Sequence, residues 1–193
     1  MVKKILISLI FIASTCLLSC SPVGVIASGG ATTMVVAEGD RSLGTVVDDA
    51  TIKINLSTKF LQADSNLFIN VNSNVINGRV LLTGIVDNQE IRIEAVKTTW
   101  EVEGVQEVVN EIEVGDKTTI KEYANDLWIN TQVKSLAAKT IGLRALSYNF
   151  ETIKGKVYIA GITSKPEQLQ KVIEVTNTVK GVKEITNYVI VKE

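Results

Sequence analysis

The chain has 193 residues, of which 46% are hydrophobic, and its formal net charge is −1. That length suits one ordinary domain or two small ones. Nucleic-acid-binding proteins need an excess of basic residues to neutralise phosphates, and this chain has no such excess. There is no histidine, which removes the commonest general base and the commonest zinc ligand and therefore disfavours an enzyme.

The first 19 residues are predicted to be a signal peptide. Two lysines precede an apolar run, Ile5 to Ala13, which is too short for a stable membrane span. The segment ends in Leu-Leu-Ser before Cys20, and this ending resembles a bacterial lipobox. The resemblance implies that Cys20 is lipidated and becomes the first residue of the mature chain. The alternative is a plain signal peptide followed by an incidental cysteine.

Removal of residues 1–19 would leave 18 basic residues against 21 acidic ones, a net charge of −3. The bulk of the protein would then not be attracted to an anionic bilayer, so any such affinity must come from a local patch. Residues 20–46 are rich in Gly, Ala, Ser and Thr and are expected to be a lipid anchor followed by a flexible linker. By analogy with lipoproteins generally, Ser21 rather than Asp after the cysteine favours the outer membrane.

The rest of the chain repeats itself at an offset of 77 residues, without a gap, over about 65 residues. Matched pairs include Asp49 and Asp126, Ile52 and Ile129, Gly78 and Gly155, Gly84 and Gly161, and Asn110 and Asn187. The repeat predicts two copies of one domain, at residues 47–115 and 124–193, joined by a short linker at 116–123.

Each copy is expected to open with a helix capped by Asp49 or Asp126. The buried helical stripes are Ile52, Leu56 and Phe60 in the first copy and Ile129, Val133 and Leu136 in the second. A strand follows, marked by Ile69 and Val71 or by Leu146, Tyr148 and Phe150. Asn77-Gly78 and Lys154-Gly155 then predict hairpin turns. Gly84 and Gly161 are expected where a helix crosses close to the sheet.

A second helix is predicted over about 88–102 and 166–179, followed by a final strand. The order αββαβ predicts an α/β (α+β) fold of two tandem two-layer sandwiches. In each, two helices cover one face of a three-stranded mixed sheet. Because about 70 residues are marginal for independent stability, the two copies are expected to pack against each other.

These motifs resemble the BON domain. The resemblance is carried by NGRVLLTGIV, by the ending G-V-x-x-V-x-N-x-I-x-V at residues 104–114, and by the tandem copies. With the lipobox, the whole is similar to dual BON-domain outer-membrane lipoproteins. The resemblance implies a non-enzymatic, periplasm-facing lipoprotein that supports envelope integrity, with phospholipid as the proposed ligand of the domain and no cofactor or metal. Lys154 departs from the pattern by replacing the turn asparagine.

Trp128 lies off the buried stripe of its helix, whereas the matching residue of the first copy is Thr51. A tryptophan on a polar helix face is typical of a membrane-water boundary. We therefore expect an anionic phospholipid membrane to contact the first helix of the second copy. The candidate residues are Trp128, Gln132, Lys134, Ser135 and Lys139, with the lysines paired to phosphate.

Several alternatives stay open from the sequence. Trp128 could instead pack between the two copies, and Trp100 is expected to pack in the core or at its edge. Asp48 beside Asp49 is better explained by a helix cap than by a catalytic carboxylate pair. The chain could also be an adaptor that binds envelope proteins through an open sheet edge or the surface between the copies.

Overall fold

The computed structural model describes residues 42–192, in which the two copies form two three-stranded sheets, each with its own helices. Domain 1 consists of α3 (Leu43–Ala63), α4 (Ser65–Asn70), β1 (Val71–Ile76), β2 (Arg79–Val86), α5 (Gln89–Trp100) and β3 (Glu107–Val114). Domain 2 consists of α6 (Ile120–Ile141), the 3₁₀ helix η2 (Gly142–Ser147), β4 (Tyr148–Ile153), β5 (Lys156–Thr163), α7 (Pro166–Asn177) and β6 (Glu184–Val191). Cys20 and the lipobox lie outside the described residues.

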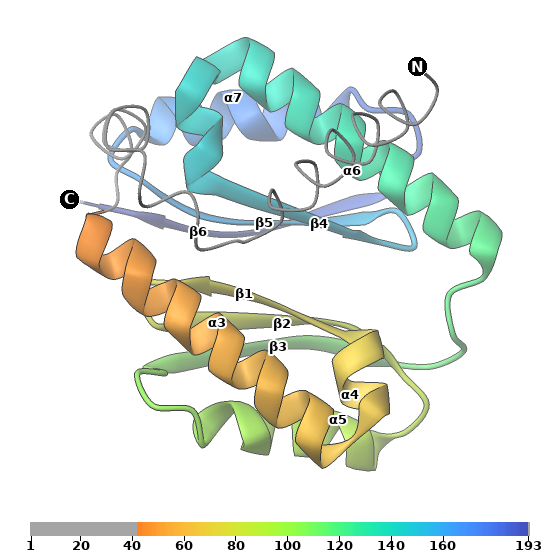
Figure 1. Cartoon of the computed structure of the whole chain (residues 1–193). Helices are drawn as coiled ribbons and strands as arrows, with labels where there is room; N and C mark the ends of the chain where they lie inside the picture. Colours follow the sequence, from red (N-terminus) through yellow and green to blue (C-terminus); the bar gives the residue numbers. More distant parts are fainter. Residues whose placement is uncertain (1–41, 193) are drawn as a thin grey trace, which may run out of the picture. The chain divides into compact units, whose positions relative to one another are not determined.

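Both sheets have the predicted mixed topology. β1 pairs antiparallel with β2, which pairs parallel with β3, and β4, β5 and β6 repeat this arrangement. In each domain the helices lie on one face of the sheet (Figure 1). The expected fold of two tandem two-layer sandwiches is therefore confirmed.

One buried carboxylate in each domain holds the first helix against the hairpin turn. Asp49 accepts hydrogen bonds from the backbone N–H groups of Asn77 and Gly78, both at 2.9 Å. Asp126 accepts the equivalent bonds from the second turn, at 2.6 and 2.8 Å. Asn77 has a φ of 52° and Gly78 one of 73°, as a type I′ turn requires. We call the pair of hydrogen bonds from this turn to the buried aspartate of the first helix the carboxylate clamp.

The prediction that Asp49 and Asp126 cap their helices is wrong. Both lie inside longer helices, and the caps are Ser42, which accepts from the N–H of Thr45, and Thr119. Thr119 forms a capping box with Glu122, which satisfies two N–H groups of the first turn. As a result α6 begins at Ile120, inside the stretch that was expected to be a linker.

The first strand of each domain begins later than predicted. Ile69 lies in α4 and Leu146 in η2, and both side chains point largely to solvent. The close approach at Gly84 also differs from the expected helix crossing. A Cβ atom there would lie 2.0 Å from the carbonyl oxygen of Asn70, the last residue of α4, so only glycine fits beside that backbone.

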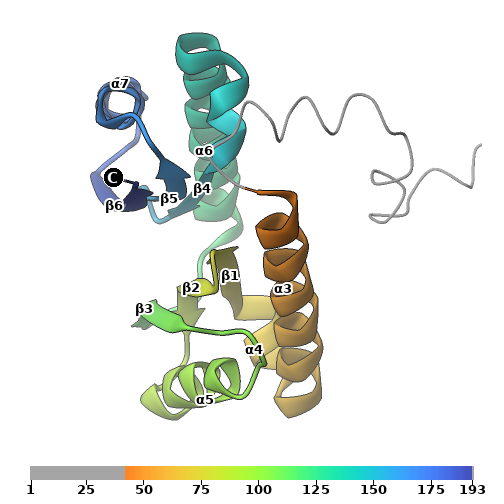
Figure 2. The same ribbon diagram turned by 90° about the vertical axis from the view of Figure 1, so that its left-hand side faces the viewer.

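The two sheets share a third hydrophobic cluster through the faces that carry no helices. Its buried members are Ile76, Leu81 and Ile85 from domain 1 and Ile153, Tyr158, Ala160 and Ile162 from domain 2. Figure 2 shows the two sheets and the helices of each domain in a view turned by 90°. The central strands β2 and β5 are buried along nearly their whole length, which explains their continuous apolar sequence. The expectation that the copies pack against each other is confirmed.

Polar side chains flank this shared cluster. Asn72 donates to Glu151 at 3.1 Å, and Lys156 lies 3.4 Å from Glu111. Tyr188 donates to the same Glu111. All three hydrophobic clusters consist of residues within 52–190, so a fragment of residues 42–193 contains the whole core.

The carboxylate clamp gives a stability prediction. Asp126→Ala leaves two backbone N–H groups without their acceptor and should lower the free energy of unfolding by about 2–4 kcal/mol. Urea unfolding of the fragment measures the change, with Asp48→Ala, an exposed residue of α3, as the matched control. Equal losses in the two variants would contradict the clamp.

Candidate functional site

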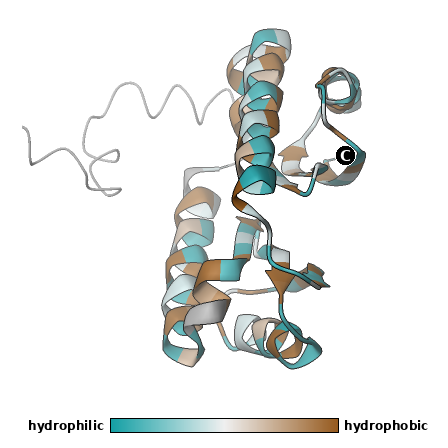
Figure 3. Ribbon diagram, turned by 90° about the vertical axis from the view of Figure 1, so that its right-hand side faces the viewer, coloured by the Kyte–Doolittle hydropathy of each residue, from teal (hydrophilic) through white to brown (hydrophobic). Residues whose placement is uncertain are grey.

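One side of α6 is fixed against the domain core. Asp126, Ile129, Val133 and Ala137 are buried at helical spacing, and the clamp at Asp126 sets the rotation of the helix. Because each residue turns the helix by about 100°, the side chains of the opposite side must face solvent. Hydrophobic and hydrophilic positions both occur along this helix (Figure 3).

The sequence-predicted residues lie on or beside that outward side. Trp128 is 48% exposed, so it is not enclosed in a core or between the domains. Lys134, Ser135 and Lys139 are exposed and Gln132 is half-buried. Lys139 follows Trp128 at helical spacing, whereas Lys134 lies on a neighbouring row of the same helix.

Three further apolar side chains share this surface. Ile120, Tyr123 and Leu127 are 89%, 65% and 56% exposed, and their spacing places them in one row that continues to Lys134. We call the surface formed by Ile120, Tyr123, Leu127, Trp128, Lys134 and Lys139 the outer α6 face. Its N-terminal half is apolar, and two lysines lie in its C-terminal half.

Sequence reasoning missed Ile120 and Tyr123 because it began the helix at Asp126, and it did not include Leu127 among the candidate residues. The available signal was Thr119 followed three residues later by Glu122, which is the pattern of a capping box. Placing the cap there would have put Ile120 and Tyr123 on the same helix as Trp128.

The first helix of domain 1 differs at the matching positions. In the 77-residue repeat, Leu127 corresponds to Ala50, Trp128 to Thr51 and Lys134 to Ser57. α3 does expose its own apolar row of Val47, Ile54 and Leu61. This row contains no tryptophan, and it provides an internal comparison for the outer α6 face.

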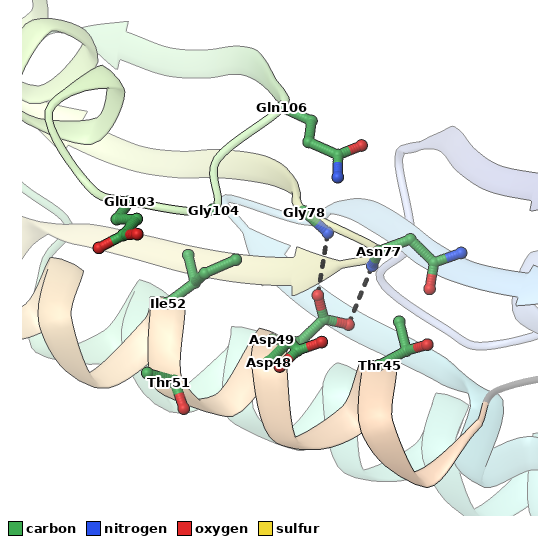
Figure 4. A pocket seen from close by; sticks show the side chains of 10 residues that line it. All are labelled: Thr45, Asp48, Asp49, Thr51, Ile52, Asn77, Gly78, Glu103, Gly104 and Gln106. Carbon is green, nitrogen blue, oxygen red and sulfur yellow. Dashed lines mark hydrogen bonds between the residues drawn. The ribbon is translucent and has the colours of Figure 1, made fainter.

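A cavity lies beside the hydrogen-bonded Asp49 of domain 1 (Figure 4). Its volume is about 490 Å³, and its lining includes Asp48, Asp49, Asn77, Gly78 and Glu103. The carboxylate of Asp49 is already bonded to the hairpin turn, whereas Asp48 is exposed. The Asp48-Asp49 pair therefore does not form two convergent carboxylates of the kind that acid–base catalysis uses.

No group of three or more metal-binding side chains occurs within residues 42–192. The same part of the chain contains no helix with the length and hydropathy needed to cross a membrane.

Among the ionisable groups at the domain boundary, Tyr188 and Glu151 have pKa values that burial raises. Burial, together with the hydrogen bond to Glu111, raises the pKa of Tyr188 to about 12. Burial also raises the pKa of Glu151, and Lys134 and Lys53 partly oppose this effect. Tyr188 therefore stays neutral at physiological pH.

The described residues form a tandem two-layer protein in which the outer α6 face is an amphipathic helix surface. The family model of the BON domain matches residues 48–116 and 125–193, and the chain belongs to the BON domain family.

Three relatives align along most of the chain. An uncharacterized protein in the gshII 5′ region of Anaplasma centrale is 38% identical over 147 residues, covering 76% of this chain and 96% of that protein. Outer membrane lipoprotein DolP of Haemophilus influenzae is 30% identical over 165 residues, covering 84% of each chain. A 21 kDa hemolysin of Actinobacillus pleuropneumoniae is 32% identical over 154 residues, covering 77% and 78%.

The raised pKa of Glu151 predicts a pH dependence. A raised pKa means that the folded state binds the proton more tightly than the unfolded chain. The contribution of Glu151 to the free energy of unfolding should therefore be fully present below the usual pKa of 4.5 and be lost as the pH rises through the raised pKa. Glu151→Gln removes this contribution and still leaves an acceptor for Asn72.

Denaturant unfolding of both proteins between about pH 4 and pH 7 measures the effect. The stability of the variant relative to the wild type should increase toward pH 7. A relative stability that decreases toward pH 7 would contradict the assignment.

Proposed function

We propose that this protein is a non-enzymatic lipoprotein of the outer membrane that faces the periplasm, binds anionic phospholipid through the outer α6 face, and supports envelope integrity. The observation that carries the proposal is a solvent-facing row of apolar side chains, with Trp128 beside it and Lys134 and Lys139 further along the helix. Soluble proteins rarely leave such a surface uncovered without a binding partner.

One relative and the N-terminal sequence support the proposed location. A relative of 30% identity is named an outer membrane lipoprotein, and the lipobox-like ending at Cys20 supports the same attachment here. Lipidation would hold the domains near a bilayer, so the outer α6 face would need only modest affinity of its own.

The chemistry of the outer α6 face matches a bilayer surface. Leu127 and Ile120 can enter the boundary between headgroups and acyl chains, while the indole N–H of Trp128 stays hydrated. Lys134 and Lys139 can each contribute about 1 kcal/mol beside anionic headgroups. This local attraction is required because the mature chain, with a net charge of −3, would otherwise be repelled.

An adaptor function is the second candidate. The outer strands β1, β3, β4 and β6 each have a neighbour on one side only within their sheet. Such edges can add a strand from a partner protein. Crosslinking in membranes followed by pull-down would detect an envelope-protein partner, which vesicle binding would not.

Vesicle flotation of the fragment tests the lipid proposal. The wild type should float with vesicles containing phosphatidylglycerol and less with phosphatidylcholine alone. Trp128→Ala and Leu127→Ala should each weaken binding about tenfold because they remove buried apolar area. Lys134→Ala and Lys139→Ala should each weaken it about fivefold, and only on anionic vesicles.

Ile54→Ala in the exposed row of α3 is the matched control, because it removes a similar apolar side chain from the first domain. It should leave flotation unchanged. The proposal fails if flotation depends on Ile54 and not on Trp128, or if Trp128→Ala lowers only the melting temperature.

A further inference from the structure

A groove of about 320 Å³ lies between α5 and the edge strand β3 of domain 1. It is lined by Gln89, Arg92, Ile93, Val96, Lys97 and Asn110. All of these residues except Asn110 belong to α5. The described residues that line this groove therefore include two cations and no carboxylate. We call it the α5 groove.

An apolar row runs along α5 through this groove and beyond it. Ile93 and Trp100 are 57% and 53% exposed, and a separation of seven residues places them on the same side of the helix. Val96 lies between them and is half-buried, so it forms the floor of the row. A row with this spacing is one against which a second helix can pack.

The two cations of the α5 groove have no partner of their own. In the part of the chain that the structure describes, the side chains of Arg92 and Lys97 make no hydrogen bond and no ion pair. Both are therefore available to the carboxylates of a ligand, and a basic ligand would be repelled.

Three carboxylates near α5 belong to other parts of the surface. Glu90 and Glu94 line a separate cavity beside α4. Glu101 directly follows the helix and is ion-paired with Lys59 at 3.3 Å. α5 as a whole carries two acidic and two basic residues, but its basic residues are the ones that line the α5 groove.

The adjoining edge of β3 is partly closed to a partner strand. The side-chain oxygen of Asn110 accepts a hydrogen bond from the backbone N–H of Ile112 at 3.0 Å. A strand added along this edge would have to displace that bond. A partner is therefore expected to lie against the side chains of α5 rather than to extend the sheet.

Domain 2 does not repeat this surface. In the 77-residue repeat, the positions of Ile93, Lys97 and Trp100 are occupied by Gln170, Glu174 and Asn177. The matching helix α7 still packs on the core of its own domain. The apolar row and Lys97 are therefore not required for packing a helix on this sheet, which favours an external contact as their role.

The α5 groove does not lie on the side of the molecule that contains α6. α5 packs on the core of domain 1 and α6 on the core of domain 2, and the shared cluster lies between the two sheets (Figure 1). A bilayer that contacts the outer α6 face is thus separated from the α5 groove by both sheets. This arrangement favours a protein as the occupant of the groove.

We propose that the α5 groove binds an acidic amphipathic helix of a partner protein. Apolar side chains of that helix would pack on Ile93, Val96 and Trp100. Carboxylates beside them would pair with Arg92 and Lys97. The inference goes beyond the lipid-binding proposal and does not rest on it.

The test uses the fragment of residues 42–193 with Trp128→Phe, in which Trp100 is the only indole. The probe is a synthetic helical peptide of about 18 residues, with leucines along one face and glutamates on both sides of that face. Binding should shift the emission of Trp100 to the blue in a saturable way and should weaken at high salt. The same peptide with lysine in place of glutamate should bind at least about tenfold more weakly.

Two variants introduce residues that domain 2 carries at the matching positions, so the fold should accept them. Ile93→Gln and Lys97→Glu should each weaken binding of the peptide about tenfold. Ile54→Gln on α3 and Lys171→Glu on α7 make the same changes at exposed positions outside the groove. These two controls should bind the peptide like the parent fragment.

Vesicles of phosphatidylglycerol separate this inference from the proposed function. They should not shift the emission of Trp100, and Ile93→Gln should leave flotation of the fragment unchanged. The inference is overturned if the glutamate peptide does not bind, if the lysine peptide binds equally well, if either groove variant binds normally, or if vesicles shift Trp100. Whether flotation depends on Trp128 is measured separately, so either proposal can fail while the other stands.

Discussion

The rotation of the first helix in each domain depends on one carboxylate. Asp49 and Asp126 each accept two backbone N–H groups from the hairpin turn, so the helix, the turn and the central strand are joined at one point. With Asp126 held there, the buried side of α6 is fixed, and its opposite side must face solvent. Every functional statement about the outer α6 face depends on this constraint.

The two domains share the carboxylate clamp but differ in the exposed surface of their first helix. The two aspartates, both turn glycines and the buried stripes occur at the same 77-residue offset. The exposed positions changed from Ala50, Thr51 and Ser57 in domain 1 to Leu127, Trp128 and Lys134 in domain 2. The helix-free faces of the two sheets pack against each other in the shared cluster.

The features that could be predicted from the sequence are those that follow from residue periodicity and from the internal repeat. The repeat, the mixed sheets, the hairpin at Asn77-Gly78 and the packing between copies follow from local patterns and from the small size of each domain. The role of Asp126 could not be predicted, because an aspartate that caps its own helix and one that bonds to a turn 28 residues later have the same local sequence. That error shortened the predicted helix and left out Ile120 and Tyr123, while Trp128 was recognised because it differs from Thr51.

The central claim is that Trp128 enters an anionic membrane. The chain has two tryptophans. Trp100, which was expected to pack in the core or at its edge, is 53% exposed at the end of α5. Trp100→Phe therefore leaves Trp128 as the only indole, whose fluorescence can be quenched by vesicles of brominated phosphatidylglycerol. The account predicts a blue shift and strong quenching for Trp128, and none for Trp100 in the reciprocal variant Trp128→Phe. Vesicle binding without quenching of Trp128 would contradict it.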